Sequence, residues 1–316
     1  MKLMGLLAAV SAAAFCATAP VQAQFKSGPW EMPTDGNLSA TLDCLEEAGL
    51  TVISAHRGGP SPGLPENAIE TMDAVLHALP SMMEIDVASS PDGVHYLMHD
   101  RTLNRTTTGE GAVTDVPWEK VAELQLVDEA GWVTPYKVPT FAETLEWAKG
   151  KTVLQVDFKR TADFKTVISE IRAADMASGV ILIAYTQGQA LRLYELAPDM
   201  LISYSVNAPG DLDAIVEAGI PAENIVAFTG TRGARPDLYE ALDAQDVEVI
   251  FGTLGRRDRS LDGVFERFGT DERYAELGDG GVDIIATDRP RAAAAALAQA
   301  ERLPQVGSCG VTRGGE

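Results

Sequence analysis

The sequence predicts an α/β fold, a closed TIM (β/α)8 barrel with a small insertion after the second strand. After residue 50, short β-branched and apolar runs alternate with longer segments of helical periodicity, and the alternation repeats eight times. The chain has 316 residues and a hydrophobic fraction of 46%, which is enough for one barrel-sized domain. We therefore place the barrel at residues 51–303.

The predicted strands are short and apolar, and the segments between them are long enough to hold a helix. The strands are residues 51–56, 82–87, 153–158, 180–185, 201–206, 224–229, 247–253 and 282–287. The helices are residues 67–79, 140–149, 162–177, 188–197, 210–218, 236–244, 262–277 and 290–302. A further helix at 39–49 is expected across the bottom of the barrel. Thr140 and Glu143 have the spacing of a helix capping box.

Residues 88–138 are too long for a simple loop between a strand and the next helix. They contain a turn signal at Asp92-Gly93 and an amphipathic piece at 117–127. We expect an insertion that covers the mouth of the barrel, because long loops in compact domains usually have a function.

The first 23 residues have the features of a secretory signal peptide. Lys2 precedes an apolar run, and Val21-Gln22-Ala23 offers small residues at a cleavage site. The alternative is a membrane anchor, for which the run is of marginal length. We expect cleavage near Ala23, a periplasmic or secreted location and no stable membrane anchor.

The two ends of the mature chain are expected to lie outside the barrel. Residues 24–38 read as an irregular arm, so the arm and the bottom helix together occupy residues 24–50, and residues 304–316 read as a tail. Cys44 and Cys309 lie near opposite ends of the chain. In an oxidising compartment they could form a disulfide, but spacing alone does not show that they are close.

The formal net charge of −21 argues against nucleic acid or anionic lipid as the main partner, because phosphate groups attract basic surfaces. An acidic surface keeps a protein soluble, and it is also compatible with a site for a divalent cation. The expected partner is a small molecule, and the oligomeric state stays open.

Reactive side chains lie on the predicted strands or just after them, at the end where a barrel of this kind carries its active site. They are His56, Arg57, Glu84, Asp86, His99, Asp157 and Lys159. Because side chains alternate along a strand, Glu84 and Asp86 share one face and point with Asp157 into the barrel mouth. Such a cluster needs a cation or protons, and oxygen ligands favour Mg²⁺ or Ca²⁺. The alternative is that some of these acids form salt bridges with Arg57 and Lys159.

Several motifs occur in a characteristic order along the chain. They are His56-Arg57-Gly58, Pro65-Glu66-Asn67, Glu84-Ile85-Asp86-Val87, Asp92-Gly93, His99-Asp100 followed by Leu103 and Arg105-Thr106-Thr107, Val138-Pro139-Thr140-Phe141 with Glu143, and Ile285-Ala286-Thr287-Asp288-Arg289-Pro290. Together they resemble the signature motifs of glycerophosphodiester phosphodiesterases, over about residues 50–290. The resemblance implies a TIM barrel, one divalent cation (Mg²⁺ or Ca²⁺), and hydrolysis of glycerophosphodiesters to glycerol 3-phosphate and an alcohol.

The resemblance implies that Glu84, Asp86 and Asp157 bind the cation. Asp157 departs from the family pattern, which usually has glutamate here, and its carboxylate is drawn back by one methylene. Glu66 is not expected to bind the cation directly. It would instead orient residues of the His56-Arg57-Gly58 motif. The alternative is that Glu66 is only an acid favoured by the helix dipole at the start of a helix.

For the chemistry itself, the resemblance implies that His56 and His99 are the acid–base pair and that Arg57 and Lys159 bind the phosphodiester. Imidazole suits both proton-transfer roles because its pKa lies near neutrality. Attack by water and attack by the substrate's own 2-hydroxyl, through a cyclic phosphate, both stay open. The family's tryptophan motif on the seventh strand is absent, so either Phe251 forms the aromatic wall of the substrate site in its place or the pocket is reshaped.

Two other functions are compatible with parts of this pattern. A related barrel phosphodiesterase acting on lysophospholipids or another head group would use the same residues beneath a wider, more apolar mouth, and it would release a cyclic phosphate if the substrate's own hydroxyl attacks. A non-catalytic periplasmic binding protein on the same fold would lack a histidine or an acid of the set, but both histidines and all three acids are present.

Overall fold

Eight parallel strands close into a barrel in the computed structural model of the protein, which describes residues 28–32 and 36–315. The strands are β2 (Val52–Ala55), β3 (Met82–Ser89), β7 (Leu154–Phe158), β8 (Val180–Ala184), β9 (Leu201–Ser205), β10 (Ile225–Phe228), β11 (Val249–Gly252) and β12 (Ile284–Thr287). Strand β2 pairs with both β3 and β12, which closes the ring. The predicted barrel is confirmed, and the strand ends differ from the predicted ones by only a residue or two.

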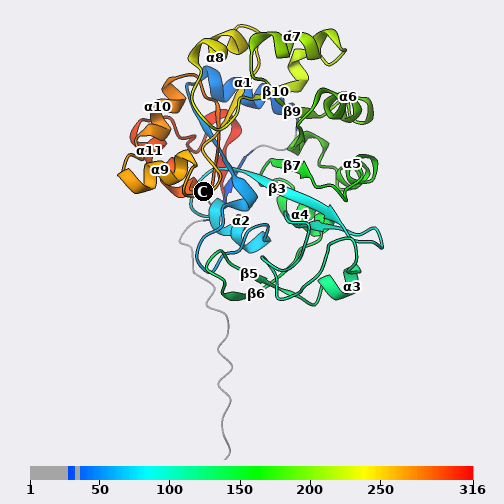
Figure 1. The fold of residues 1–316 in the computed structure, drawn as a ribbon. Helices are drawn as coiled ribbons and strands as arrows, with labels where there is room; N and C mark the ends of the chain where they lie inside the picture. Colours follow the sequence, from blue (N-terminus) through cyan, green and yellow to red (C-terminus); the bar gives the residue numbers. More distant parts are fainter. Residues whose placement is uncertain (1–27, 33–35, 316) are drawn as a thin grey trace, which may run out of the picture.

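Helices lie around the outside of the strands (Figure 1). They are α2 (Ile69–Leu76), α4 (Phe141–Ala148), α5 (Phe164–Ala173), α6 (Gln187–Leu196), α7 (Pro209–Glu217), α8 (Pro236–Asp243), α9 (Leu261–Phe268), α10 (Arg273–Asp279) and α11 (Pro290–Gln299), with short 3-10 turns η1 (His56–Gly58), η2 (Ala177–Gly179) and η3 (Ala222–Asn224). The capping box of Thr140 and Glu143 is present at the start of α4. The single helix predicted over 262–277 is in fact two, because Gly269 adopts a left-handed conformation with φ 64° and ends α9.

Side chains alternate along each strand between the barrel interior and the helix layer. At the N-terminal ends of the strands the interior residues form an apolar floor, made of Val52, Met82, Val153, Ile181, Leu201, Val226, Ile250 and Ile284. Helix α1 (Leu38–Glu47) packs Leu38, Leu42 and Leu45 against this floor, which confirms the helix predicted across the bottom. The barrel is therefore closed at one end, and its interior polar residues are further along the strands.

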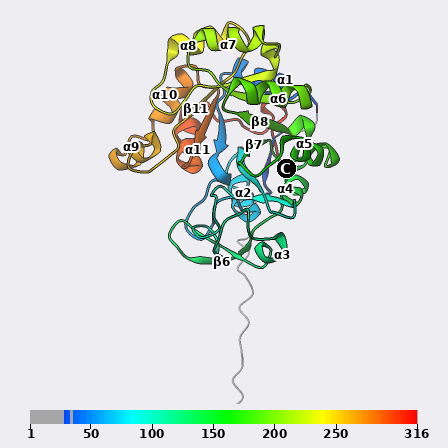
Figure 2. The same cartoon turned by 45° about the vertical axis from the view of Figure 1, so that its right-hand side comes forward.

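The insertion after β3 forms a small unit beside the barrel with its own apolar cluster. It contains β4 (His95–Leu97), which pairs antiparallel with the end of β3, a short helix α3 (Trp118–Val121), and the hairpin of β5 (Gln125–Val127) and β6 (Val133–Lys137). Figure 2 shows α3 and β6 on the side of the molecule away from α7 and α8. The amphipathic piece at 117–127 is thus part helix and part strand rather than one continuous element.

The two ends of the described chain meet at the bottom of the barrel. Strand β1 (Trp30–Glu31) pairs antiparallel with β13 (Thr312–Arg313), so the arm and the tail are more ordered than the sequence indicated. A disulfide joins Cys44 of α1 to Cys309 of the turn η4 (Ser308–Gly310), with their Cα atoms 5.9 Å apart. The predicted signal peptide lies outside the described residues. Within the described part, none of the helices is both long enough and apolar enough to cross a bilayer.

Candidate active site

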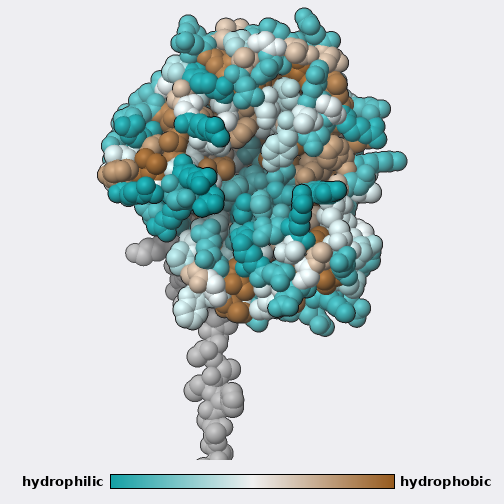
Figure 3. Space-filling model, in the orientation of Figure 1, coloured by the Kyte–Doolittle hydropathy of each residue, from teal (hydrophilic) through white to brown (hydrophobic). Residues whose placement is uncertain are grey.

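A cavity of about 240 Å³ opens at the C-terminal ends of the barrel strands. It is lined by His56, Glu84, Asp86, His99, Gln155, Asp157, Lys159, Ile183, Ala184, Tyr185, Ser203, Ser205, Phe228, Ile250, Leu254 and Ala286. Both predicted histidines, the three predicted acids and the predicted lysine therefore come together in one place. The face drawn in Figure 3 is hollowed near its middle, and hydrophilic residues surround the hollow.

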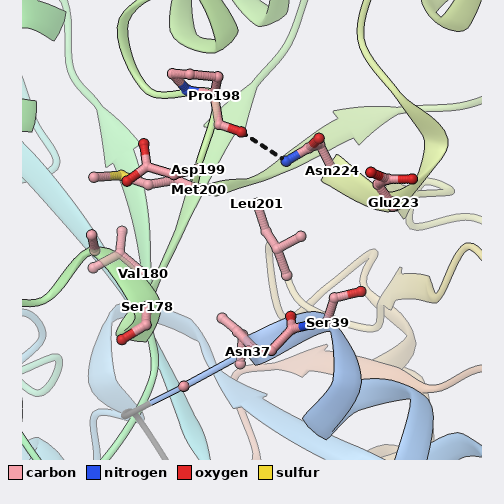
Figure 4. A pocket seen from close by; sticks show the side chains of 13 residues that line it. Asn37, Ser39, Ser178, Val180, Pro198, Asp199, Met200, Leu201, Glu223 and Asn224 are labelled. Atoms are coloured by element: carbon pink, nitrogen blue, oxygen red, sulfur yellow. Dashed lines mark hydrogen bonds between the residues drawn. The ribbon is translucent and has the colours of Figure 1, made fainter.

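A second hollow, of about 340 Å³, lies at the opposite end of the barrel (Figure 4). It is lined by the start of α1 and by the segments that lead into β8 and β9, including Asn37, Val180 and Asp199. Asn224 donates a hydrogen bond to the Pro198 carbonyl at its edge. None of the predicted site residues lines this hollow, so the cavity at the C-terminal strand ends is the candidate active site.

Three buried carboxylates form the centre of the candidate site. Glu84 and Asp86 extend from the same face of β3, and Asp157 extends from the neighbouring strand β7, where it pairs in register with Asp86. One oxygen of each carboxylate lies within 4.8 Å of the others. Lys159 Nζ lies 2.5 Å from Asp86 Oδ1 and 2.6 Å from Asp157 Oδ2. The strand alternation used in the sequence argument thus places these acids correctly.

The electrostatics of this cluster favour a bound cation. Burial, together with the charge of Asp86, raises the pKa of Glu84 to about 8. Burial alone would raise the pKa of Asp86, but the charges of Lys159 and Arg57 lower it below its ordinary value. Lys159 Nζ, 2.5 Å from Asp86 Oδ1, balances part of this buried charge. The three acids offer oxygen ligands only, which is the ligand type that Mg²⁺ and Ca²⁺ prefer.

His56 lies at the end of β2 and is held by a carboxylate from the last strand of the barrel. Its Nδ1 lies 2.6 Å from Asp288 Oδ1. Because a carboxylate only accepts, Nδ1 carries the hydrogen, and Nε2 is left on the side of Glu84, 3.9 Å from Oε2. Burial alone would lower the pKa of His56, but the hydrogen bond to Asp288 and the charge of Glu84 raise it above its ordinary value.

His99 follows β4 and enters the cavity from the insertion. Its Nδ1 lies 2.8 Å from Oδ1 of the adjacent residue Asp100. The Arg105 guanidinium contacts the same carboxylate through Nε and Nη2, at 2.7 and 3.0 Å. The hydrogen bonds from Arg105, with a smaller contribution from His99, hold the pKa of Asp100 well below its ordinary range. The carboxylate of Asp100 is therefore ionised and accepts the Nδ1 hydrogen of His99.

Arg57 does not itself line the cavity, but it contacts two of the acids that do, Glu84 and Asp86. Its φ of 53° lies in the left-handed region, which is uncommon outside glycine and occurs mostly where the surroundings impose it. Its backbone N–H donates to Glu84 Oε2 at 2.8 Å, and its Nη1 donates to both Glu66 oxygens at 3.1 and 3.2 Å. Its Nε is buried and lies 3.7 Å from Asp86 Oδ2, beyond hydrogen-bond distance.

Asn67 is a further residue that positions the acidic cluster. It also has a positive φ, 56°, which asparagine tolerates better than most residues. Its Nδ2 donates to Asp86 Oδ2 at 2.7 Å, and its Oδ1 accepts from the Asp86 backbone N–H at 3.0 Å. The Pro-Glu-Asn motif thus contacts the site twice, through Glu66 to Arg57 and through Asn67 to Asp86.

The predicted aromatic wall at Phe251 is wrong. Phe251 is fully buried between the barrel and the helix layer and does not line the cavity. Its neighbour Ile250 faces the interior instead, because adjacent residues of a strand point to opposite sides. The aromatic side chains of the cavity are Phe228, from β10, and Tyr185, at the end of β8. The Tyr185 hydroxyl donates to Asp157 Oδ2 at 2.8 Å.

Besides Asn67, three site residues were not assigned a role from the sequence: Asp288, Asp100 and Tyr185. Asp288 and Asp100 lie within motifs that the sequence argument quoted, and Tyr185 ends a predicted strand. The rule that active-site residues follow the strand ends applied to all three. Their contacts with His56, His99 and Asp157 depend on which strands are neighbours and on side-chain directions, which the one-dimensional pattern does not specify.

Comparisons with known proteins agree on one family. The model of the glycerophosphoryl diester phosphodiesterase family matches residues 56–220. A glycerophosphodiester phosphodiesterase from Bacillus altitudinis is 32% identical over 213 residues, which cover 64% of this chain and 84% of the relative. Matches to two other curated relatives cover 64% and 43% of those relatives' own length.

Solved structures show the same fold. A glycerophosphoryl diester phosphodiesterase from Parabacteroides distasonis superposes with a TM-score of 0.76 at 28% identity, covering 90% of this chain and 98% of that one. An Oleispira antarctica phosphodiesterase in complex with its product sn-glycerol-3-phosphate superposes with a TM-score of 0.59 at 18% identity, covering 80% of this chain and 98% of that one. The barrel, the cavity at the strand ends and these matches together show that the chain belongs to the glycerophosphoryl diester phosphodiesterase family.

Proposed function

We propose that this protein hydrolyses glycerophosphodiesters to glycerol 3-phosphate and an alcohol, with the help of one divalent cation. The observation that carries the proposal is the convergence, in one cavity, of two carboxylate-bound histidines and three clustered acids. Family membership supports the reaction class. The product bound in the Oleispira antarctica structure supports the identity of the phosphate-bearing product.

Glu84, Asp86 and Asp157 would hold the cation. Their oxygens are close enough to share one ion, and burial of three negative charges without a cation is unfavourable. A hard divalent ion bound there, Mg²⁺ or Ca²⁺, would neutralise the charge that develops on the phosphodiester oxygens. The Tyr185 hydroxyl and the Lys159 amine both donate to Asp157 Oδ2, which fixes the direction of this short acid.

His56 and His99 would act as the acid–base pair. In the reaction a new P–O bond forms to the attacking oxygen and the P–O bond to the alcohol breaks. One imidazole takes the proton of the attacking hydroxyl, and the other gives a proton to the departing alcohol oxygen. The carboxylates of Asp288 and Asp100 bind Nδ1 of the two rings, so each ring offers Nε2 for proton transfer.

Arg57 and Lys159 would bind the non-bridging oxygens of the phosphodiester. Both are cations next to the acidic cluster, and Arg57 Nε, 3.7 Å from Asp86 Oδ2, makes no hydrogen bond there. A guanidinium is suited to phosphate because its donors lie in one plane. Binding of an anionic substrate beside three acids needs this positive charge in addition to the cation.

A second candidate substrate class is lysophospholipids, and one feature of the cavity favours it. The wall opposite the charged residues is apolar and includes Ile183, Phe228, Ile250 and Leu254. Such a wall would accept an acyl chain as well as the carbon face of glycerol. We also propose a periplasmic or secreted location, supported by the Cys44–Cys309 disulfide, since disulfides persist mainly in oxidising compartments.

The test is an assay of the purified protein on glycerophosphocholine and on lysophosphatidylcholine, after treatment with EDTA and after return of Mg²⁺ or Ca²⁺. We expect release of glycerol 3-phosphate from glycerophosphocholine, its loss with EDTA and its recovery with a cation. Faster turnover of lysophosphatidylcholine would favour the second substrate class. No turnover of either diester with any cation would refute the proposed function, and N-terminal sequencing of the periplasmic or secreted fraction would test the location.

A further inference from the structure

Arg105 joins two parts of the candidate site that come from different segments of the chain. Its guanidinium binds the Asp100 carboxylate through Nε and Nη2. It also binds the Glu66 carboxylate, with Nη1 2.7 Å from Oε2 and Nη2 2.8 Å from Oε1. The planar guanidinium thus donates to two carboxylates, with two hydrogen bonds to each.

Each of these carboxylates contacts a residue of the proposed machinery. Asp100 binds Nδ1 of His99, and Glu66 accepts two hydrogen bonds from Nη1 of Arg57. A continuous chain of contacts therefore runs from His99 through Asp100, Arg105 and Glu66 to Arg57. Residues 99–105 come from the insertion, whereas Arg57 and Glu66 come from the segment after β2.

Glu66 is the most buried member of this chain. Its side chain is 4% exposed, and it is enclosed by the Arg57 and Arg105 guanidinium groups. A buried carboxylate that lost one of two cationic partners would be left with unmet hydrogen-bonding capacity. After loss of Arg105, we expect the Glu66 carboxylate to engage more of the hydrogen-bond donors of Arg57, which the phosphodiester also needs. Arg105 therefore satisfies part of the hydrogen-bonding capacity of Glu66 and leaves Arg57 donors available for the substrate.

Asp100 depends on Arg105 in a different way. Its side chain is only partly buried, at 27% exposure, so little packing holds the carboxylate against the His99 ring. The two contacts from Arg105 fix its orientation, and the oriented carboxylate in turn holds the hydrogen on Nδ1 of His99. Without them the neutral ring could adopt the other tautomer, with its hydrogen on Nε2 instead of Nδ1.

We propose that Arg105 is a positioning residue that sets the tautomer of His99 through Asp100 and the availability of Arg57 through Glu66. This inference rests on the proposed function, because it assigns Arg105 a role in the same site. Arg105 connects the insertion to the barrel, and both of its carboxylate partners contact residues of the active site.

The test compares Arg105→Gln with Arg172→Gln. Arg172 makes a matched two-point contact with Asp199 on the surface, so its loss removes a comparable ion pair elsewhere. We expect Arg105→Gln to lower kcat/KM by about 10- to 100-fold and Arg172→Gln to leave it unchanged. Wild-type kcat/KM in Arg105→Gln, or an equal loss in both variants together with a lowered melting temperature, would overturn the proposal.

Separate variants of the two carboxylates distinguish positioning from general destabilisation. Asp100→Asn is expected to lower mainly kcat, because it affects His99, and Glu66→Gln is expected to raise mainly KM, because it affects Arg57. Arg105→Gln should do both. Arg105→Lys keeps the charge but lacks the planar fork, so it should recover only a small part of the loss; full recovery would contradict the geometric argument.

Nitrogen NMR of the histidine rings gives a readout that does not depend on turnover. In the wild type we expect His99 to carry its hydrogen on Nδ1, and in Arg105→Gln we expect a mixture of tautomers, with His56 unchanged. An unchanged His99 tautomer would overturn the proposal. If the wild type hydrolysed no phosphodiester, the proposed function would fail, and the His99 tautomer would still decide whether Arg105 positions this ring.

Discussion

Asp288 Oδ1 lies 2.6 Å from Nδ1 of His56, although 232 residues separate them along the chain. They meet because β12, which ends just before Asp288, pairs in parallel with β2, which ends just before His56. Closure of the barrel therefore places Asp288, just after the last strand, where its carboxylate orients His56. The same arrangement recurs locally at His99, whose Nδ1 is bound by the adjacent Asp100. In both imidazoles Nδ1 is therefore bound by a carboxylate, and Nε2 stays available for proton transfer.

Replacing Asp288 with asparagine tests the orientation of His56. The change removes a negative charge that raises the pKa of His56, so this pKa should fall. The limb of the pH profile of kcat/KM that belongs to His56 should shift to lower pH, and kcat should fall on the order of 10²-fold, because an amide can also stabilise the wrong tautomer. An unshifted profile with unchanged kcat would show that Asp288 does not control His56.

Removing the cation should affect stability as well as activity. Lys159 compensates only part of the charge of the three buried carboxylates, so binding of Mg²⁺ or Ca²⁺ should stabilise the folded protein. At a cation concentration about 100 times Kd, the expected gain in the free energy of unfolding is about 2.7 kcal/mol. Calorimetric melting with EDTA and with each cation measures this gain. Glu84→Gln should reduce it, and an equal gain in Glu84→Gln and wild type would place the cation elsewhere.

Three acids at the bottom of the barrel should make the protein less stable at alkaline pH. Burial, together with neighbouring acids, raises the pKa of Glu46 to about 8, of Glu248 to about 9 and of Asp283 to about 6. In the unfolded chain these groups release their protons near pH 4, so the folded protein binds more protons above that pH. Stability should therefore decline as pH rises from about 4 through about 9. Melting temperatures at constant cation concentration measure the decline, and Glu248→Gln should reduce it; a melting temperature that rises over this range would contradict the assignment.

The disulfide between Cys44 and Cys309 should stabilise the bottom of the barrel. It links α1 to the C-terminal segment over a sequence separation of 265 residues, and cross-links of long loops restrict the unfolded chain most. We expect Cys44→Ser with Cys309→Ser to lower the free energy of unfolding by about 2–4 kcal/mol. Denaturant titration measures this loss, with the wild type in reducing agent as the matched control. Equal midpoints for the double variant and the oxidised wild type would rule out a stabilising role.

The barrel could be predicted because its signals are local. Each strand is a short apolar run, each helix has its own periodicity, and one helix begins at the predicted cap, Thr140. The acids of β3 could be placed on one face because a strand has a period of two. The prediction was less successful where two elements share one stretch of sequence, as at α9 and α10, since the break depends on the conformation of Gly269.

The contacts within the site were harder to predict from the sequence. In β11 nearly every residue is apolar, because both faces of a parallel strand are buried, so the pattern does not show that Ile250 faces the cavity and Phe251 faces the helices. The contact of Asp288 with His56 depends on barrel closure, and that of Arg105 with Glu66 depends on how the insertion folds back over the site. Such contacts between distant segments have no local signal.

The central claim is that His56 and His99 perform the acid–base chemistry of a metal-dependent phosphodiester hydrolysis. The most direct measurement is kcat for release of glycerol 3-phosphate from glycerophosphocholine, with saturating cation, in His56→Ala, His99→Ala and His77→Asn. His77 caps the end of α2 outside the cavity and serves as the matched control. We predict a loss of about 10²- to 10⁴-fold in each of the first two variants and wild-type turnover in the third. Wild-type turnover in His56→Ala or His99→Ala would contradict the account.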